Sequence, residues 1–241
     1  MLIPSPRHTA IDLEVWARLE QTDQVLAGSE HLARREEAAL AELQRFAGLD
    51  GTCFVAVSWG KDSVVVAHLA VRAGLRVPFV WVRYDPSHNP DCPAVRDVFL
   101  RRFPVDYQEI VVTDTCLPAG VGWRDLTWEQ DCRLFFREAD ELGRRILGLR
   151  ARESGRRRRR ARRFGCSSPS SCAPIVWWDA ALVFAYLRKY DLPVHPAYAM
   201  SEGGFWDRAR IRVDGIGDER GTGCGRGQWE RRYYPEVPRC T

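Results

Sequence analysis

The chain has 241 residues, 45% of them hydrophobic, which is enough for one α/β domain with a full core. It carries 36 basic and 32 acidic residues for a net charge of +4, and no apolar run approaches the roughly 18 to 20 residues that span a bilayer. The opening residues lack the basic-then-apolar pattern of a secretion signal, so we expect a cytoplasmic globular protein with no membrane partner.

The first elements in chain order are one or two amphipathic helices, predicted over residues 11 to 47. Leu13, Trp16 and Leu19 recur at helical spacing, so we expect them to share the buried face. These helices form a lead-in to the α/β alternation that follows.

A strand is predicted over 52–57 and a helix over 62–73, with a turn of small and polar residues between them. The turn reads Ser58-Trp59-Gly60-Lys61-Asp62-Ser63. Such a strand–turn–helix exposes convergent backbone N–H groups at the positive end of a helix dipole, where an anion is favoured. We therefore predict a phosphate-binding loop, with a tight turn that holds no ligand as the alternative.

Each residue of this loop has an expected role. Gly60 allows close approach to a phosphate, and Ser58 and Ser63 supply hydroxyl groups. Lys61 supplies a mobile charge, and the choice is informative because only two of the 36 basic residues are lysines. A carboxylate beside a phosphate is repulsive, so Asp62 indicates either a Mg²⁺ ligand or a helix N-cap.

The loop differs from the commonest phosphate loop, because Val55 stands where the first Gly of G-x-x-x-x-G-K-[ST] belongs and Asp62 follows Lys61. It resembles the S-x-G-K-D-S signature of the PP-loop ATP pyrophosphatases, which usually have Gly in place of Trp59. The resemblance implies an adenine nucleotide alpha-hydrolase-like fold. It also implies ATP and Mg²⁺ as ligands, with cleavage of ATP between its α and β phosphates.

The alternation of strands and helices continues along the chain. Further strands are predicted over 77–82, 107–112 and 146–149, and further helices over 91–103 and 128–137. This order predicts a doubly wound, mainly parallel sheet with helices on both faces and ligands beyond the carboxyl ends of the strands. Asp85 follows the second strand, so it is a candidate ligand for a nucleotide or a metal ion.

Two later segments resemble the phosphoadenylyl-sulfate (PAPS) reductase family. Gly148-Leu149-Arg150-Ala151-Arg152-Glu153-Ser154 is similar to its G-[IL]-R-x-x-E-S segment, and residues 174–196 are similar to its P-I-x-x-W...L-P-x-x-P segment. Arg150 and Arg152 follow the strand predicted over 146–149, so we expect them to bind the acceptor or the transferred group, with Glu153 orienting one of them. Because ligands lie beyond the carboxyl ends of the strands, we expect this segment and the phosphate loop to meet in one cleft. A solvated helix start is the alternative reading.

Members of the family differ in chemistry, so several functions stay open. The Lys61-Asp62 pair fits members that use ATP to adenylate an acceptor, in sulfur metabolism or in sulfur modification of nucleic acids. The alternative is thiol-dependent reduction of PAPS, for which Cys240 is the only candidate nucleophile retained near the chain end. A third reading is a non-catalytic nucleic-acid-binding protein. Some relatives also work beside a partner subunit.

An arginine island spans Arg156–Arg163. Residues 144–163 hold 11 arginines and one acid, a local charge of +10 that leaves the rest of the chain at −6. Such a patch attracts nucleic acid and other polyanions, but we predict a solvated loop for it. No aromatic residue interleaves the arginines of 150–163, which argues against a stacking platform.

The eight cysteines contain no C-x-x-C pair, so we predict free thiols, with Cys53 as a small core residue. Cys166, Cys172 and Cys224 match no standard spacing for an iron–sulfur cluster, which disfavours one. We divide the chain into a helical segment (1–48), a PP-loop α/β domain (49–200) and a Gly/Arg-rich C-terminal segment (201–241). We predict that the last segment packs back on the domain, because it contains the aromatic residues Trp229, Tyr233 and Tyr234.

Overall fold

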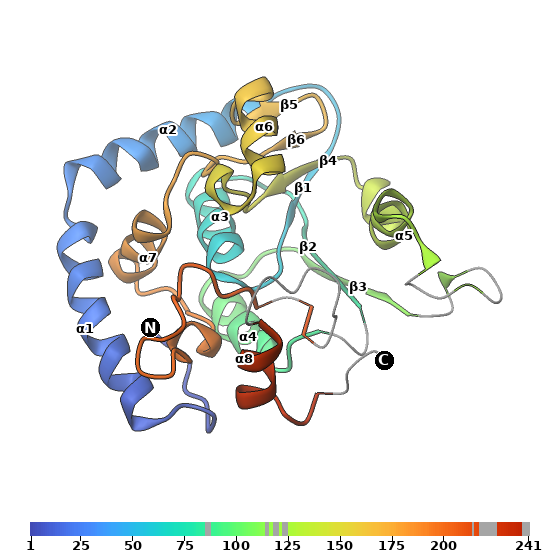
Figure 1. The fold of residues 1–241 in the computed structure, drawn as a ribbon. Coiled ribbons are helices and arrows are strands. Elements are labelled where there is room, and N and C mark those ends of the chain that lie inside the picture. Colours follow the sequence, from blue (N-terminus) through green and yellow to red (C-terminus); the bar gives the residue numbers. More distant parts are fainter. Residues whose placement is uncertain are drawn as a thin grey trace.

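The computed structural model describes residues 1–84, 88–113, 116–117, 121, 125–213, 215–216 and 226–237. Figure 1 shows a mainly parallel sheet with helices on both faces, as the sequence predicts. Its strands are β1 (Cys53–Ala56), β2 (Phe79–Tyr84), β3 (Tyr107–Val112), β4 (Arg144–Leu147), β5 (Ser167–Ser168) and β6 (Ser171–Cys172). Its α-helices are α1 (Ala10–Ala27), α2 (Glu30–Ala47), α3 (Lys61–Arg72), α4 (Cys92–Arg102), α5 (Trp128–Asp140), α6 (Gly155–Phe164), α7 (Ala180–Lys189) and α8 (Arg226–Tyr233). Two short 3-10 helices are η3 (Ala151–Glu153) and η4 (Pro196–Ala199).

The strand order in the sheet is β3-β2-β1-β4-β6-β5. All neighbouring strands run parallel except β5 and β6, which form an antiparallel pair. The chain leaves β1 toward β2 on one side and returns to β4 on the other, so the order reverses between β1 and β4. Ligands of open α/β sheets bind at such a switch point.

The two faces of the sheet are covered by different helices, as Figure 1 shows for α3 and α5. Side chains alternate across each strand, so Val55 of β1 faces the large core that includes α3 and α7, whereas Phe54 faces the opposite way. Phe54 packs in a smaller cluster with Val80, Val112 and Ala139 of α5. The sheet is therefore buried on both faces, as parallel sheets require.

The N-terminal helices are confirmed and Trp16 is buried as predicted, but the predicted burial of Leu13 and Leu19 is wrong. Leu13 and Leu19 are 44% and 36% exposed. The buried side of α1 instead carries Trp16 together with the carboxylates of Asp12 and Asp23. The side chain of Asp12 accepts bonds from the backbone N–H groups of residues 201 and 202, so polar contacts direct this helix toward the C-terminal segment.

Two strands lie two residues away from their predicted positions. β2 covers 79–84 rather than 77–82, and β4 covers 144–147 rather than 146–149. Both strands contain arginines, and a strand prediction based on runs of apolar residues leaves arginines out. Two nitrogens of the Arg144 guanidinium, Nη1 and Nη2, donate to the carbonyl oxygens of Phe46, Leu49 and Gly51, which is why a charged residue is tolerated there.

The arginine island is a helix, α6, and the predicted loop is wrong. The Ser154 hydroxyl accepts a bond from the Arg157 N–H at 3.1 Å and caps the helix. The side chain of Arg157 also pairs with Glu153, and Ala161 is buried. Arginine is a good helix former, so a cap and one buried contact outweigh the repulsion between the charges. The segment between Cys166 and Cys172 forms a short hairpin, β5–β6.

The C-terminal aromatics pack back on the domain as predicted, because Trp229, Tyr233 and Tyr234 are each no more than 3% exposed. The Trp229 indole N–H donates to the Met200 carbonyl at 2.8 Å. Within the described chain, Cys53 is a buried free thiol, as are Cys92 and Cys172, while Cys116 and Cys166 are partly exposed free thiols. No helix of the described residues is long and apolar enough to cross a membrane.

Candidate nucleotide-binding site

The loop between β1 and α3 is held by its own hydrogen bonds. The Ser58 N–H donates to the Ser63 hydroxyl at 3.2 Å, and that hydroxyl donates to the Gly60 carbonyl at 3.0 Å. Helix α3 begins directly after Gly60, which has no side chain of its own to cap it. The first N–H groups of this apolar helix therefore stand at the switch point, which is the arrangement that favours an anion.

Trp59 has a left-handed backbone, with φ of +59°, which is costly for a residue with a side chain. Its indole is fully buried and packs against Phe99 and Tyr107, with ring centroids 5.7 and 5.6 Å away. The resemblance implies Gly at this position, and the positive φ explains why. Trp59 is thus part of the core beneath the loop, and its side chain is not placed to contact a ligand.

At two positions, Gly60 and Gly148, neighbouring atoms lie so close to the backbone that a side chain would not fit. A Cβ on Gly60 would lie 2.9 Å from Val213 and 3.2 Å from the Tyr198 hydroxyl. A Cβ on Gly148 would lie 2.7 to 2.9 Å from backbone atoms of Asp62 and Ser63. Gly148 follows β4, so this contact seats the β4 segment directly against the start of α3.

The contact brings together a buried cluster of charged groups, as the sequence predicts for the two segments. The Arg150 Nε donates to Asp62 Oδ1 at 2.6 Å, and the Lys61 Nζ lies 3.1 Å from Asp62 Oδ2. All three residues are less than 10% exposed. Glu153 accepts a bond from the Arg150 backbone N–H at 2.9 Å, so it orients this segment.

Tyr198 of η4 is a site residue that the sequence did not indicate. Its hydroxyl accepts a bond from the Lys61 backbone N–H at 3.0 Å, and the Lys61 ammonium lies 4.9 Å from the centre of its ring. Burial and the nearby Asp62 carboxylate raise the pKa of Tyr198 well above its ordinary value. It therefore stays a neutral phenol, which holds the start of α3 and faces Lys61. The one sequence feature that points to Tyr198 is its position two residues after the 174–196 segment.

The described residues do not fit the magnesium ion that the resemblance implies. Both oxygens of Asp62 already face cations, and two cationic neighbours repel a third. Among the described residues, no three His, Cys, Asp or Glu side chains gather as a metal site. The arrangement suits Asp62 to fixing Lys61 and Arg150.

The remaining candidate residues lie elsewhere. Arg152 is not drawn into the cluster with Arg150: its side chain is 73% exposed and lies 3.9 Å from Asp179. Asp85 and Cys240 lie outside the described residues. A role for either residue stays a prediction.

A loop that lies at the switch point and leads into an apolar helix belongs to the class of doubly wound α/β proteins, which bind ligands at this position. A family comparison agrees, since residues 52–224 match the phosphoadenosine phosphosulfate reductase domain. The chain belongs to this family, whose members are enzymes. No curated protein matches the chain.

Two solved structures are similar to the chain in fold. NMN synthetase from Francisella tularensis is 16% identical with a TM-score of 0.50, covering 67% of this chain and 71% of that one. A phosphoadenylyl-sulfate (PAPS) reductase from Candida auris, solved as a phosphate complex, is 14% identical with a TM-score of 0.44, covering 70% of this chain and 89% of that one. At 16% identity, the first similarity shows the fold alone.

Proposed function

We propose that the protein binds ATP at the loop of residues 58–63 and cleaves it between the α and β phosphates to adenylate an acceptor. The observation that carries this proposal is the buried cluster of Lys61, Asp62 and Arg150 at the switch point. Two carboxylates there meet three cations: Asp62 lies between Lys61 and Arg150, and Glu153 lies 4.0 Å from Arg150 and also pairs with Arg157. The cluster therefore keeps a positive charge at the positive end of α3, and a polyphosphate would neutralise it.

The chemistry follows from this charge distribution. The acceptor's nucleophilic atom attacks the α-phosphorus, and the bond from this phosphorus to the α,β-bridging oxygen breaks. That oxygen keeps the electron pair and leaves as part of pyrophosphate. Lys61 and Arg150 stabilise the charge that develops on the departing group, while the loop N–H groups position the phosphates.

The decisive residue is Lys61, and the chain offers a matched control because its only other lysine is Lys189. Lys189 is the last residue of α7 and bonds Glu36 of α2 at 2.8 Å. We expect Lys61→Ala to weaken ATP binding about 10- to 150-fold, the loss for one hydrogen bond to a charged group. Lys189→Ala should leave the affinity unchanged. Isothermal titration with α,β-methylene ATP, which cannot be cleaved, measures both.

Two outcomes would contradict the proposal. Equal ATP affinity in wild type and Lys61→Ala would remove Lys61 from the site. Binding of PAPS but not ATP would favour the reductase alternative, in which Cys240 is the nucleophile. Once ATP binding is established, pyrophosphate release with sulfate, a flavin precursor, a nucleobase or a protein carrier identifies the acceptor.

Asp62 has a separate test that distinguishes an anchoring role from a metal role. As an anchor, its replacement by Asn leaves buried cations unpaired, so Asp62→Asn should lower the free energy of unfolding by about 3 kcal/mol, measured in urea. The ratio of ATP affinities with Mg²⁺ and with EDTA should be the same as in wild type. A ratio that falls toward one in the variant would show that Asp62 holds the metal ion.

A further inference from the structure

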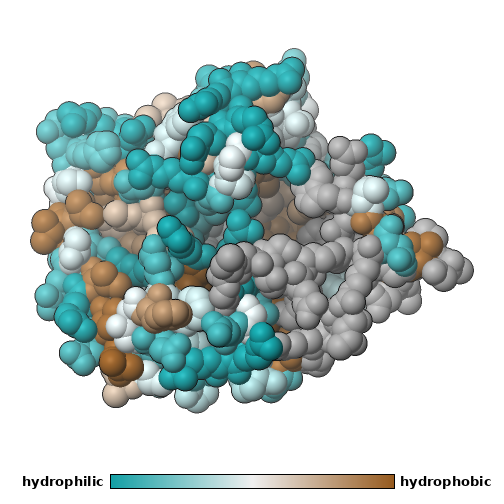
Figure 2. All heavy atoms as spheres, in the orientation of Figure 1, coloured by the Kyte–Doolittle hydropathy of each residue, from teal (hydrophilic) through white to brown (hydrophobic). Residues whose placement is uncertain are grey.

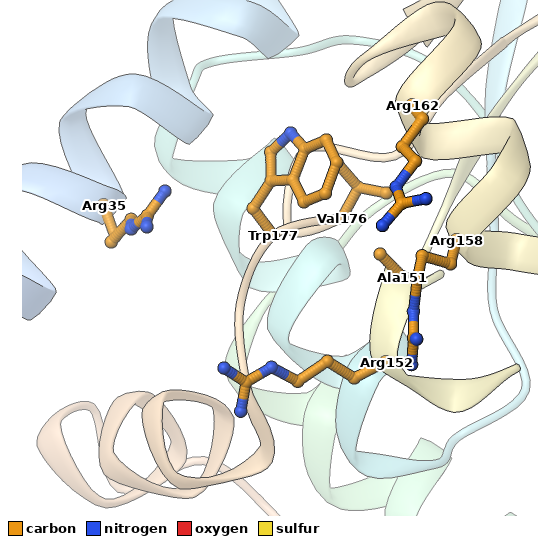
Figure 3. Close-up of a pocket in the computed structure, with 7 residues that line it drawn as sticks. All are labelled: Arg35, Ala151, Arg152, Arg158, Arg162, Val176 and Trp177. Atoms are coloured by element: carbon orange, nitrogen blue, oxygen red, sulfur yellow. The ribbon is translucent and has the colours of Figure 1, made fainter. Parts of the chain in front are cut away.

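A second site is built where α2, α6 and the segment before α7 meet. A pocket of about 680 Å³ opens there, which is the size of a site for a small organic ligand. Figure 3 shows its lining side chains, which come from four separate segments of the chain. They are Arg35, Ala151, Arg152, Arg158, Arg162, Val176 and Trp177. None of them belongs to the loop of residues 58–63.

The pocket is strongly basic, and among the described residues its four arginines have a single carboxylate partner, Asp179. Arg158 and Arg162 are four residues apart, so they share one face of α6. Among the described residues, neither of them nor Arg35 takes part in a salt bridge, and the nearest carboxylate to Arg152 is 3.9 Å away. Four guanidinium groups with one distant carboxylate repel one another, and an anionic ligand would relieve that repulsion.

The opposite side of α6 shows that these positions are specialised. Arg157 pairs with Glu153, and Arg160 donates to the Ser171 hydroxyl at 2.7 Å. These two arginines attach the helix to the protein, whereas Arg158 and Arg162 face the pocket (Figure 3). The helix thus has a structural side and a side available to a ligand.

The pocket also contains an exposed aromatic ring. Trp177 is 45% exposed, although the next residue, Trp178, is 2% exposed. Val176 and Ala151 are buried beside it, so the pocket has an apolar base. An indole face next to guanidinium groups is the combination that stacks an unpaired base and holds its phosphates. No aromatic residue lies among the arginines of 150–163, but the fold brings Trp177 from outside that range into the pocket with Arg158 and Arg162.

The positive surface continues beyond the pocket, which favours a chain of phosphates over a single nucleotide. Arg159 and Arg163 are exposed on α6, a helix of ten residues and about 15 Å. Figure 2 shows hydrophilic residues over this part of the surface. We propose that the pocket and α6 bind single-stranded nucleic acid, with one base stacked on Trp177 and the adjacent phosphates held by Arg158 and Arg162.

The test measures fluorescence anisotropy of labelled single-stranded DNA and RNA of about twelve nucleotides. Trp177→Ala should weaken binding about 5- to 150-fold, the usual range for loss of one stacked base, while Trp177→Phe should retain most of the affinity. The side chain is half exposed, so neither variant should unfold. Thermal unfolding checks this.

The arginines have a matched control on the same helix. Arg158→Ala with Arg162→Ala should lower the slope of log K against log salt by about 1.4, which corresponds to two phosphate contacts on a single strand. Arg159→Ala with Arg163→Ala removes the same charge outside the pocket and should cost less affinity. Equal losses of affinity in both double variants would mean that the arginines attract the oligonucleotide only through their total charge. That result would overturn the proposal.

Three other results would also overturn it: no binding of any oligonucleotide, equal binding of duplex and single strand, or no effect of Trp177→Ala. Competition by ATP that is lost in Trp177→Ala would show instead that the pocket holds a free nucleotide. The inference does not depend on the proposed function. Oligonucleotide binding should survive in Lys61→Ala, so the two proposals can fail separately.

Discussion

Trp59 combines an unfavourable backbone with a large buried side chain, and its two effects can be separated by mutation. We expect Trp59→Ala to lower the free energy of unfolding by about 3 to 5 kcal/mol, because the contacts with Phe99 and Tyr107 are lost. Trp59→Gly removes the same side chain but accepts the positive φ without strain.

The Gly variant should therefore be more stable than the Ala variant by about 1 kcal/mol, although Ala is ordinarily the more stabilising residue. Urea unfolding of the three proteins measures both differences. An Ala variant as stable as the Gly variant would contradict the left-handed conformation. Loss of stability in both would confirm that packing keeps Trp59 in place.

At the scale of elements, the junction between β4 and α3 forms the site. Gly148→Ala would place a methyl group within 3 Å of backbone atoms that cannot rotate away. The start of α3 must then shift, so we expect ATP binding to be lost and the free energy of unfolding to fall by about 2 to 4 kcal/mol.

Gly155→Ala is the matched control, because its added Cβ meets only the end of the Arg159 side chain at 3.7 Å. It lies at the start of α6, where Ala should be neutral or stabilise by up to about 1 kcal/mol. Titration with ATP and urea unfolding compare the two variants. Retained ATP binding in Gly148→Ala would show that the β4 segment does not control the loop.

The sequence predicted well those elements whose apolar residues are also the buried ones in the structure. β1, the loop and α3 have apolar runs on either side of a turn, and β3 was predicted to the residue. Prediction failed where a charged residue has a tertiary partner. The arginines of β4 looked like loop residues because their partners, such as the Phe46 carbonyl for Arg144, lie far away in the sequence. The α6 helix has near partners, the Ser154 cap and Glu153, but the run of like charges favoured a loop in the prediction.

The same reason limited prediction of the sites. Lys61, Asp62 and Arg150 belong to short patterns and were found, and the contact between them followed from the positions of their strands. Tyr198 lies outside the quoted segments, and Trp177 stands at a variable position of the P-I-x-x-W segment. Each reaches its site through a turn whose position depends on the packing of the whole molecule, so only the structure reveals them.

At the scale of the whole molecule, two buried histidines link stability to pH. Burial, with the nearby Arg72 and Arg102, lowers the pKa of His68 from 6.5 to about 4. Burial, with Arg7 and His8, lowers the pKa of His195 to about 3. Both are neutral in the folded protein, whereas the unfolded chain binds protons below about pH 6.5.

Because the unfolded state binds more protons, the free energy of unfolding should fall as the pH drops from 6.5 toward 4. Each histidine contributes up to about 1.4 kcal/mol per pH unit. His68→Phe keeps the ring packing against Phe103 and Tyr190 but removes one titrating group. Urea unfolding between pH 4.5 and 7 should therefore show a smaller slope in this variant, and an unchanged slope would contradict the assignment.

The seven arginines of α6 also make this helix a natural target for trypsin. Trypsin needs an extended substrate, so cleavage there follows the fraction of molecules in which the helix has opened. Like charges favour opening, and a polyanion that spans them closes the helix. Limited digestion with trypsin therefore measures ligand binding to this surface. The rate of cleavage within residues 156–163 should fall as the fraction of protein with a bound ligand rises.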